Sequence, residues 1–413
     1  MTNEMKSVNL EEVSNIIMGQ SPDSEHYNEK GYGYPFLQGC ANFTSKYPRA
    51  EIFCSIPSKI APKDSILISV RAPVGDLNLS DREYCIGRGL ASIIPTKIDL
   101  YYLYYSISLN KKDFNRVSQG STFDAINSQD LRQFKVLVPI HKREEKRISE
   151  ILLTVDRSIE NTEKLIEKYK NIKQGLMQDL LVRGMQTNGK LRPSYEEEPE
   201  LYQETDIGPI PTDWEVYHLN ELGQVVTGST PSTNIETYYG GNTMFISPFD
   251  ITEEVIYINS TEKTLTTEGL QQTRTIPENS ICVVCIGSTI GKIAITTKEC
   301  ATNQQINTLV PNNKNLYKLY YYLMEFYLKR QLMVEAGLQA VPIVNKSKFE
   351  KMIVPIPSDE KEQKDICETL TSIDKKIESE NLYLNKLYKV KQALMQDLLT
   401  GKVRVKVEED GDE

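Results

Sequence analysis

Hydrophobic and polar positions along this chain follow two different periods. Short apolar runs bounded by Gly, Pro, Asn or Ser have the length of β-strands. Two tyrosine-rich segments between such runs, 100–109 and 316–328, are expected to be helices. Strands mixed with helices predict an α+β domain in each half of the chain. The runs expected to be strands are 66–70, 90–94, 134–138, 281–286, 292–296 and 308–310.

Each half ends in a much longer helical pattern. From 144 to 181, apolar residues recur at alternating steps of three and four, which is the spacing of a heptad repeat. The stretch 366–398 repeats this spacing. A proline precedes each pattern and a glycine follows it, as is typical of helix boundaries. These flanking residues are Pro139 and Pro357 before the helices, and Gly184 and Gly401 after them.

The two halves are related by duplication. KQGLMQDLL at 173–181 recurs as KQALMQDLL at 391–399, with eight identities in nine positions at an offset of 218. Upstream the offset falls to 216 and then to 209, as loop insertions between related halves would produce. The halves run over about 8–183 and 217–401. A chain built twice from one domain and one long helix predicts pseudo-two-fold symmetry.

A helix with one apolar seam has to bury that seam. Two equivalent helices can bury their seams against each other, and the alternative is that each packs on its own globular part. We expect an antiparallel two-helix coiled coil that joins two globular domains. The expected seam residues are Ile148, Val155, Ile159, Tyr169, Ile172, Leu176, Leu180, Ile366, Ile373, Ile377, Leu387, Val390, Leu394 and Leu398. The expected segments are a first domain at 1–140, its helix at 141–184, a linker at 185–213, a second domain at 214–357, its helix at 358–401 and an acidic tail at 402–413.

Composition narrows the class of protein. The 413 residues carry a net charge of −9, but part of the acid lies in the expected linker and tail, and residues 1–140 are neutral with 15 basic and 15 acidic residues. Local basic surfaces are therefore compatible with the acidic total. No apolar run approaches the roughly 20 residues that span a bilayer, so we expect no membrane partner. Seven cysteines do not form a disulfide framework, and together with the absence of a visible signal sequence they favour the cytoplasm.

Candidate catalytic and metal motifs fail on their spacing. Cys282 and Cys285 have the spacing of a metal or redox pair, but they lie in an apolar strand that would direct them to opposite faces. The segment 287–292 resembles a phosphate-binding loop, yet it is one residue short and Ile293 stands where Ser or Thr would bind magnesium. The three histidines have no Ser or Cys partner at a known spacing. We therefore expect a binding protein without catalytic residues, metal or cofactor.

The motifs reached so far resemble one known family, the specificity (S) subunits of type I restriction–modification systems. VLVPIHKREEKRISEILLTVDRSI at 136–159 resembles the entry into the family's first shared helix, and 354–377 repeats it. The KQGLMQDLL and KQALMQDLL pair resembles the family's helix ends. IGPIPTDWEVYHLNELGQVVTGSTP at 207–231 is similar to the opening of a second recognition domain, and 119–139 to the end of the first. The first half lacks the IPxxW opening and the second lacks the GST signature, which implies that the halves read different sequences.

This resemblance implies a non-enzymatic reader of double-stranded DNA. Its two recognition domains would each read one part of a bipartite target, with the coiled coil as a ruler between them. Two methyltransferase subunits would dock on the chain, carry the methyl donor, and methylate an adenine that leaves the base stack. A nuclease/translocase (restriction) subunit can join such a complex. Two alternatives stay open: a relative fused to its own methyltransferase, and a coiled-coil adaptor without a DNA role.

Base recognition needs polar side chains on exposed loops. Each candidate can instead be a turn or capping residue, and the tyrosine clusters can stack on bases or, as we favour, pack in the core. The candidate DNA-binding residues are Gln20, Ser21, Arg71, Arg88, Gln119, Ser121 and Thr122 in the first half, and Ser229, Thr230, Ser288, Lys292, Asn303, Gln304, Gln305, Asn345 and Lys346 in the second.

Overall fold

The computed structural model describes residues 5–112, 114, 125–252, 255–337 and 341–406. The chain divides into two units. Unit 1 contains Met1–Leu165 and Glu380–Glu413, and unit 2 contains Ile166–Ser379. Each unit therefore combines one globular part with a portion of both long helices.

The short strands of unit 1 form two main sheets. A four-stranded sheet has the order β2-β10-β7-β8, a five-stranded sheet has the order β3-β5-β4-β9-β6, and β1 pairs with β11. The strands are β1 (Met5–Asn9), β2 (Ser14–Met18), β3 (Tyr27–Asn28), β4 (Tyr34–Leu37), β5 (Ile52–Cys54), β6 (Ile60–Ala61), β7 (Ile66–Ser69), β8 (Leu77–Leu79), β9 (Tyr84–Ile86), β10 (Leu90–Pro95) and β11 (Lys135–Pro139). The helices are α1 (Leu10–Val13), α2 (Leu100–Leu109), α4 (Ser128–Arg132) and the first part of α5 (Lys142–Val182), with 3-10 turns at Ser24–His26 and Cys40–Asn42.

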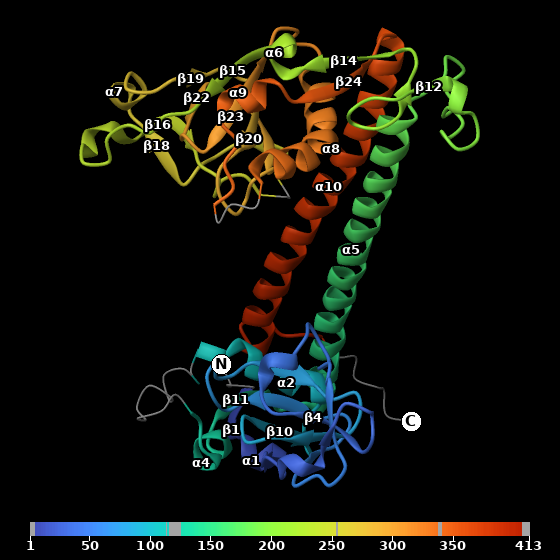
Figure 1. The fold of residues 1–413 in the computed structure, drawn as a ribbon. Helices are drawn as coiled ribbons and strands as arrows, with labels where there is room; N and C mark the ends of the chain where they lie inside the picture. Colours follow the sequence, from blue (N-terminus) through green and yellow to red (C-terminus); the bar gives the residue numbers. More distant parts are fainter. Residues whose placement is uncertain (1–4, 113, 115–124, 253–254, 338–340, 407–413) are drawn as a thin grey trace. The chain divides into compact units, whose positions relative to one another are not determined.

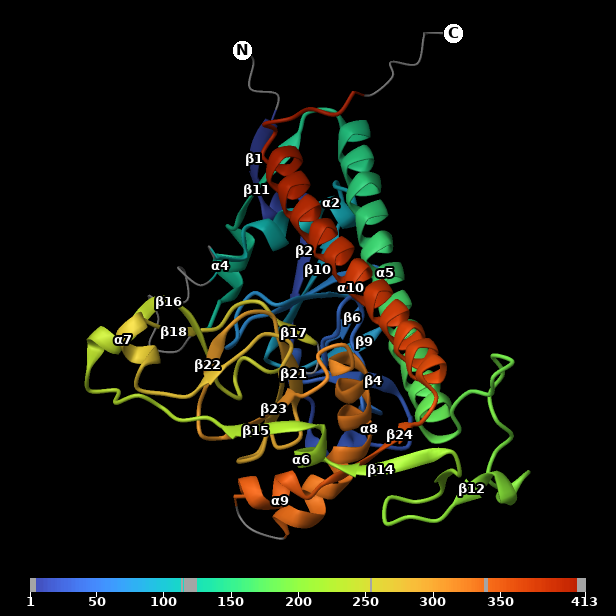
Figure 2. The same ribbon diagram turned by 90° about the horizontal axis from the view of Figure 1, so that it is seen from above.

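Unit 2 repeats this arrangement. Its sheets have the orders β15-β23-β20-β21-β17 and β18-β16-β22-β19, and β14 pairs with β24, beside which it lies in Figure 2. The strands are β12 (Tyr202–Gln203), β13 (Ile210–Pro211), β14 (Trp214–His218), β15 (Gly223–Thr227), β16 (Tyr239–Ile246), β17 (Tyr257–Ile258), β18 (Lys263–Leu265), β19 (Thr275–Ile276), β20 (Ile281–Val284), β21 (Ile293–Thr296), β22 (Cys300–Thr302), β23 (Ile306–Pro311) and β24 (Ile353–Pro357). The helices are α6 (Leu219–Leu222), α7 (Thr267–Leu270), α8 (Tyr317–Ala336), α9 (Lys346–Glu350) and the first part of α10 (Glu360–Leu399), with 3-10 turns at Pro199–Leu201 and Glu236–Tyr238.

The register of the strands confirms the internal duplication. Val8 lies opposite Val136 in the β1–β11 pair, and Tyr217 lies opposite Val354 in the β14–β24 pair. The parallel pair β4–β9 corresponds to the parallel pair β16–β22, because Leu37 lies opposite Ile86 and Ile246 opposite Thr302. The predicted α+β class is confirmed in both units.

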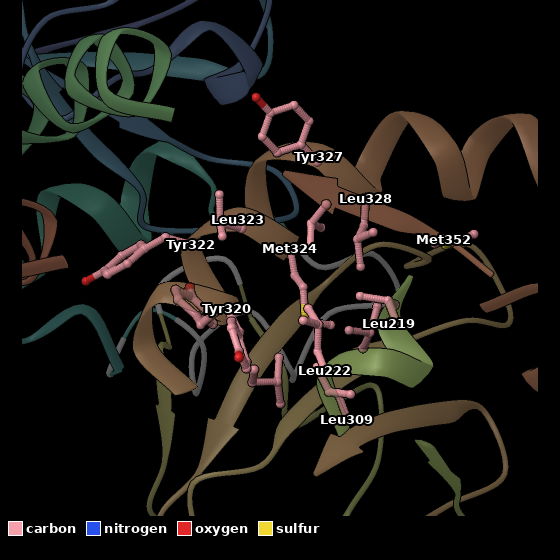
Figure 3. Close-up of a cluster of buried hydrophobic side chains, with 14 of the residues drawn as sticks. Leu219, Leu222, Leu309, Tyr320, Tyr322, Leu323, Met324, Tyr327, Leu328 and Met352 are labelled. Atoms are coloured by element: carbon pink, nitrogen blue, oxygen red, sulfur yellow. The ribbon is translucent and has the colours of Figure 1, made fainter. Parts of the chain in front are cut away.

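Buried side chains explain why the sheets and the tyrosine-rich helices pack together. In unit 2, α8 shares one large apolar cluster with residues of β20 and β23 and contributes about a third of its buried side chains. Figure 3 shows Leu219, Leu222 and Leu309 gathered around Met324, while the hydroxyl of Tyr322 points away from them. In unit 1, α2 has the same role. The tyrosine clusters are therefore core residues, as the sequence favours, and Tyr102, Tyr105, Tyr320, Tyr321 and Tyr322 are at most 5% exposed.

Within each unit, α5 and α10 run antiparallel (Figure 1). In unit 1, Asp156 contacts Lys391 and, about two turns further along α5, Glu163 accepts a hydrogen bond from Tyr388. In unit 2, Lys173 of α5 contacts Asp374 of α10. Residues with higher numbers on α5 contact residues with lower numbers on α10, which confirms the predicted antiparallel pair.

Burial corrects the predicted seam at two equivalent positions. Ile172 is 40% exposed and Val390 is 46% exposed, so neither lies in the interface between the helices. The lysine after each of them, Lys173 or Lys391, faces the opposite helix instead and pairs with an aspartate. Among the other predicted positions, the buried ones are Ile148, Ile159, Leu180, Ile366, Ile373 and Leu398, and the half-buried ones are Val155, Tyr169, Leu176, Ile377, Leu387 and Leu394.

A glutamate in the first turn of each long helix binds an arginine that follows the other helix. In unit 2, Arg192 donates to both carboxylate oxygens of Glu362, at 2.5 and 3.0 Å. In unit 1, Arg404 donates to both carboxylate oxygens of Glu144, at 2.7 and 2.5 Å. Part of the segment expected to be a linker, 185–213, is therefore fixed on unit 2, where it also forms the β12–β13 pair.

Candidate nucleic-acid interface

Three loops of unit 1 meet at one end of its sheets. They follow β2, β4 and β9, and we name them the first loop cluster (residues 19–22, 38–41 and 87–89). The backbone N–H of Gly19 donates to the carbonyl of Leu90 at 2.9 Å, which places the loop after β2 against β10. Gln20 N donates to Ile86 O at 3.0 Å, and Gly87 N donates to Leu37 O at 2.8 Å. Backbone hydrogen bonds thus fix the three loops against one another.

Unit 2 repeats this construction. The second loop cluster (residues 228–231, 247–250 and 303–305) follows β15, β16 and β22. The equivalent hydrogen bonds run from Gly228 N to Ile306 O at 3.1 Å, from Ser229 N to Thr302 O at 3.0 Å, and from Asn303 N to Ile246 O at 2.9 Å. Two halves with different loop sequences therefore preserve the same backbone framework.

Glycine is required where the first and third loops of each cluster touch. A Cβ atom on Gly19 would lie 2.2 Å from the carbonyl oxygen of Gly87, and one on Gly228 would lie 2.1 Å from that of Asn303. Both distances are far below van der Waals contact with backbone, which cannot move aside. The close approach holds the loops in place, and the side chains that follow each glycine carry the variation between the units.

The first loop cluster exposes one basic side chain and two amide side chains. Ser21 donates from its hydroxyl to Gln38 Oε1 at 3.0 Å, and the backbone N–H of Arg88 donates to the Ser21 hydroxyl at 3.4 Å. The side chains of Gln20, Gln38 and Arg88 are exposed. Because Arg and Gln side chains offer the donors and acceptors that recognise base edges, this set can read DNA.

The second loop cluster presents a different set. Thr230 donates to Gln304 Oε1 at 2.5 Å. These two residues occupy the positions equivalent to Ser21 and Arg88 of the first cluster. Asn303 donates from Nδ2 to Gln305 Oε1 at 3.0 Å, so both amides are held by each other. Ser229 shares a hydrogen bond with Thr273 at 2.8 Å. Gln304 and Thr230 are the exposed members of this cluster among the predicted residues.

A further loop lies beside each cluster. Val70 N donates to Gly89 O at 2.9 Å, which brings exposed Arg71 next to the first cluster. In unit 2, Cys285 N donates to Gln305 O at 2.8 Å, which brings exposed Ser288 next to the second. Lys292 is half-buried and lies directly before β21, on the far side of the same turn.

The remaining predicted residues do not join the clusters in this way. Asn345 is the N-cap of α9 and accepts a hydrogen bond from Lys348 N at 3.0 Å, and Lys346 pairs with Glu350 on the same helix at 3.4 Å. Their side chains are thus engaged in local structure, as expected if they are capping residues and not DNA contacts. Gln119, Ser121 and Thr122 lie outside the described residues.

Two residues of the clusters were missed by the sequence analysis, Gln38 and Phe249. Both lie in the middle loop, after β4 and after β16. The pairing of Phe36 with Phe245 at the offset of 209 aligns these two strands, and it was the signal that could have found the loops that follow them. Arg274, which donates to Thr227 O at 2.6 Å beside the second cluster, carries no such signal.

The paired cysteines point to opposite sides of β20. Cys282 packs in one apolar cluster and Cys285, directly after the strand, packs in another. Burial raises the pKa of each thiol to about 12, so neither is an activated nucleophile. Among the described residues, Asp23, Glu25 and His26 bring three possible ligand atoms together, on an exposed turn. The described helices include none that is both long and apolar enough to cross a membrane.

The sequence profile described as "Type I restriction modification DNA specificity domain" matches this chain twice, at residues 2–171 and 211–389. The provisionally named MjaX specificity subunit of a type I restriction enzyme from Methanocaldococcus jannaschii is 39% identical over 191 residues, which are 46% of this chain and 43% of that protein. The HindI specificity subunit of Haemophilus influenzae is 32% identical over 205 residues, which are 47% of this chain and 42% of that protein. The chain thus aligns with less than half the length of each of these relatives.

Solved structures share the fold. The S subunit of a type I restriction–modification system from M. genitalium superposes with a TM-score of 0.62 at 14% identity, covering 97% of both chains. A chain from a study of complex assembly and conformational transition of the type I R-M system superposes with a TM-score of 0.52 at 13% identity, covering 98% of this chain and 99% of that chain. At these identities the likeness concerns the arrangement of elements.

Proposed function

Because the chain belongs to the family of type I restriction–modification DNA specificity domains, we propose that it reads a bipartite DNA target with its two loop clusters. The first cluster contacts one part of the target and the second contacts the other. Recognition is the contribution of this chain. Methyl transfer and DNA cleavage are contributions of partner subunits.

The repeated loop framework is the observation that carries the proposal. Three backbone hydrogen bonds of unit 1 recur in unit 2, while the exposed side chains they present differ: Arg88 in one cluster corresponds to Gln304 in the other. A constant framework with variable polar side chains suits two sites that bind the same kind of molecule with different sequence preferences. Arg favours guanine and Gln favours adenine, so the two clusters are expected to read different bases.

The negative net charge of the chain fits a DNA-recognition subunit that works in a complex. Phosphate contacts supply much of the affinity of proteins for DNA, and they require basic residues. With a net charge of −9, this chain leaves much of that contribution to its partners. Two methyltransferase subunits, which also bring the methyl donor, and a nuclease/translocase (restriction) subunit are the partners proposed.

Methylome sequencing tests the proposal. The chain is expressed with its methyltransferase subunit in a host that lacks other adenine methyltransferases, and the control strain expresses the methyltransferase subunit alone. A bipartite motif with one methylated adenine per strand, found only when this chain is present, is the expected result. A soluble complex that leaves no methylated motif would contradict the proposal and favour the adaptor alternative.

A further inference from the structure

Phe249 is the most exposed large apolar side chain in the part of the chain that the structure describes, at 78%. It lies in the middle loop of the second loop cluster, three residues after the end of β16. The carbonyl of Ile246, the last residue of that strand, accepts the hydrogen bond from Asn303 N that fixes the third loop. The phenyl ring is therefore displayed beside the polar residues proposed to read DNA.

The turn that carries Phe249 is held firmly. Asp250 N donates to Ser247 O at 3.0 Å and closes the turn. One oxygen of the Asp250 carboxylate accepts from the backbone N–H and the hydroxyl of Ser247, at 2.8 and 2.7 Å. The other oxygen accepts from Glu262 N at 2.8 Å, which ties the turn to the chain that leads into β18.

The residues around this turn fix its position further. Ile246 and Ile251, which flank it, are both fully buried in one apolar cluster. Pro248 restricts the backbone directly before Phe249, because the proline ring fixes φ at about −65°. An exposed ring on a fixed turn loses little conformational entropy when it binds, since it has only two side-chain torsions to order.

The equivalent loop of unit 1 has no such feature. Leu37 O accepts from Gly87 N as Ile246 O accepts from Asn303 N, so the two loops align residue by residue. In that alignment Phe249 corresponds to Cys40, which lies in a 3-10 turn and is only half exposed. The ring is therefore not part of the shared framework and distinguishes the second cluster from the first.

We infer that Phe249 inserts against the bases of the target part read by unit 2 and contacts a base face by stacking. Apolar side chains that enter DNA in this way partly unstack a base step, and aromatic rings stack on bases of any sequence. The polar residues Thr230 and Gln304 then read base edges beside the step at which the ring enters. This inference rests on the proposed function and adds a second mode of contact to it.

Fluorescence of 2-aminopurine tests the inference. Duplexes that contain the motif methylated by the native complex carry 2-aminopurine at one position at a time, and the complex of this chain with its methyltransferase subunit is added. The native complex should raise the fluorescence at one step of one half-site. Phe249→Ala should abolish this rise and weaken binding about tenfold, whereas Phe249→Trp should retain both.

Tyr32→Ala is the matched control. Tyr32 is 67% exposed, and it lies at the opposite end of β4, the strand equivalent to β16, away from the loop cluster. It should leave fluorescence and affinity unchanged. Unchanged fluorescence and affinity in Phe249→Ala would overturn the inference, as would a loss of assembly with the methyltransferase subunit, which would assign the ring to a protein contact. Failure of the native complex to methylate any motif counts instead against the proposed function.

Discussion

Lys391 Nζ lies 2.6 Å from Asp156 Oδ1, so the last part of α10 is paired with the first part of α5 inside unit 1. Tyr105 of α2 donates to the other oxygen of the same carboxylate at 2.6 Å. One aspartate therefore connects both long helices to the globular part. Unit 2 has the same triad at equivalent positions, with Lys173 and Tyr322 on Asp374 at 3.0 and 2.6 Å.

Removing Asp156 should loosen unit 1. Asp156→Ala leaves the Tyr105 hydroxyl and the Lys391 ammonium without their shared acceptor, and we expect a loss of about 2 kcal/mol in the free energy of unfolding. Asp156→Asn keeps one oxygen for Tyr105 and should lose about 1 kcal/mol. Urea unfolding followed by circular dichroism measures both.

Glu150→Gln is the control for this series, because Glu150 is exposed and pairs with Arg147 on the same helix. It should change the stability by less than about 0.5 kcal/mol. Asp374→Ala should reproduce the effect of Asp156→Ala in unit 2. If Asp156→Ala unfolded at the same urea concentration as the native chain, the triad would not anchor the unit.

Stability should fall in acid through Glu144. Burial alone would raise the pKa of this carboxyl, but hydrogen bonds from Arg404 and from Val405 N outweigh burial and hold the pKa below its usual value of 4.5. A carboxyl with a lowered pKa in the folded state stabilises the fold above its unfolded pKa, and this contribution is lost as the pH falls through the folded pKa. Glu144→Gln should therefore be about 2 kcal/mol less stable than the native chain at pH 7.

The difference in stability between the native chain and Glu144→Gln should shrink below a pH of about 4. Unfolding of the native chain and of Glu144→Gln at a series of pH values measures it, with Glu150→Gln again as the control. A difference that stayed constant or grew toward acid would show that the ionised form of Glu144 is not what Arg404 stabilises.

Arg88 should contribute to DNA affinity. Its exposed side chain lies two residues after the end of β9, in the first loop cluster. Arg88→Ala should weaken binding of the assembled complex to its motif about tenfold. Arg82→Ala is the control, because Arg82 is an exposed arginine at the other end of β9, paired with Asp81. Titration of a fluorescent duplex measures both, and equal losses from the two variants would contradict a local role of the cluster.

The length of the helix pair should set the length of the unspecified spacer in the target. Seven residues inserted between Leu165 and Ile166 and seven between Ser379 and Glu380 lengthen both helices where the two units divide, and preserve the heptad spacing. Methylome sequencing should then find the same two half-sites with a longer spacer. Lower activity at an unchanged spacer length would contradict the role of the helices as a ruler.

The sequence predicted those features that depend on local periodicity. The helix expected at 100–109 is α2 with identical bounds, and the strand expected at 66–70 is β7, Ile66–Ser69. The helix expected at 316–328 extends to Ala336 in α8, because KRQLMVEA continues with good helix formers after the tyrosine-rich part ends.

Features that join distant segments could not be predicted in this way. A heptad pattern assigns apolar residues to the seam, so it selected Ile172 and Val390, although Lys173 and Lys391 face the opposite helix. Their partners come from another helix, and a tyrosine from the globular part completes each triad. The loop clusters likewise depend on backbone contacts between segments such as 19–20 and 86–90, which no local pattern reveals.

Methylome sequencing of two matched variants tests the central claim most directly. One variant carries Gln38→Ala with Arg88→Ala in the first cluster, and the other carries Thr230→Val with Gln304→Ala in the second. If each cluster reads its own part of the target, the first variant should relax base preference in one half of the methylated motif and the second variant in the other half. Relaxation of the same half by both variants, or an unchanged motif in both, would contradict the account.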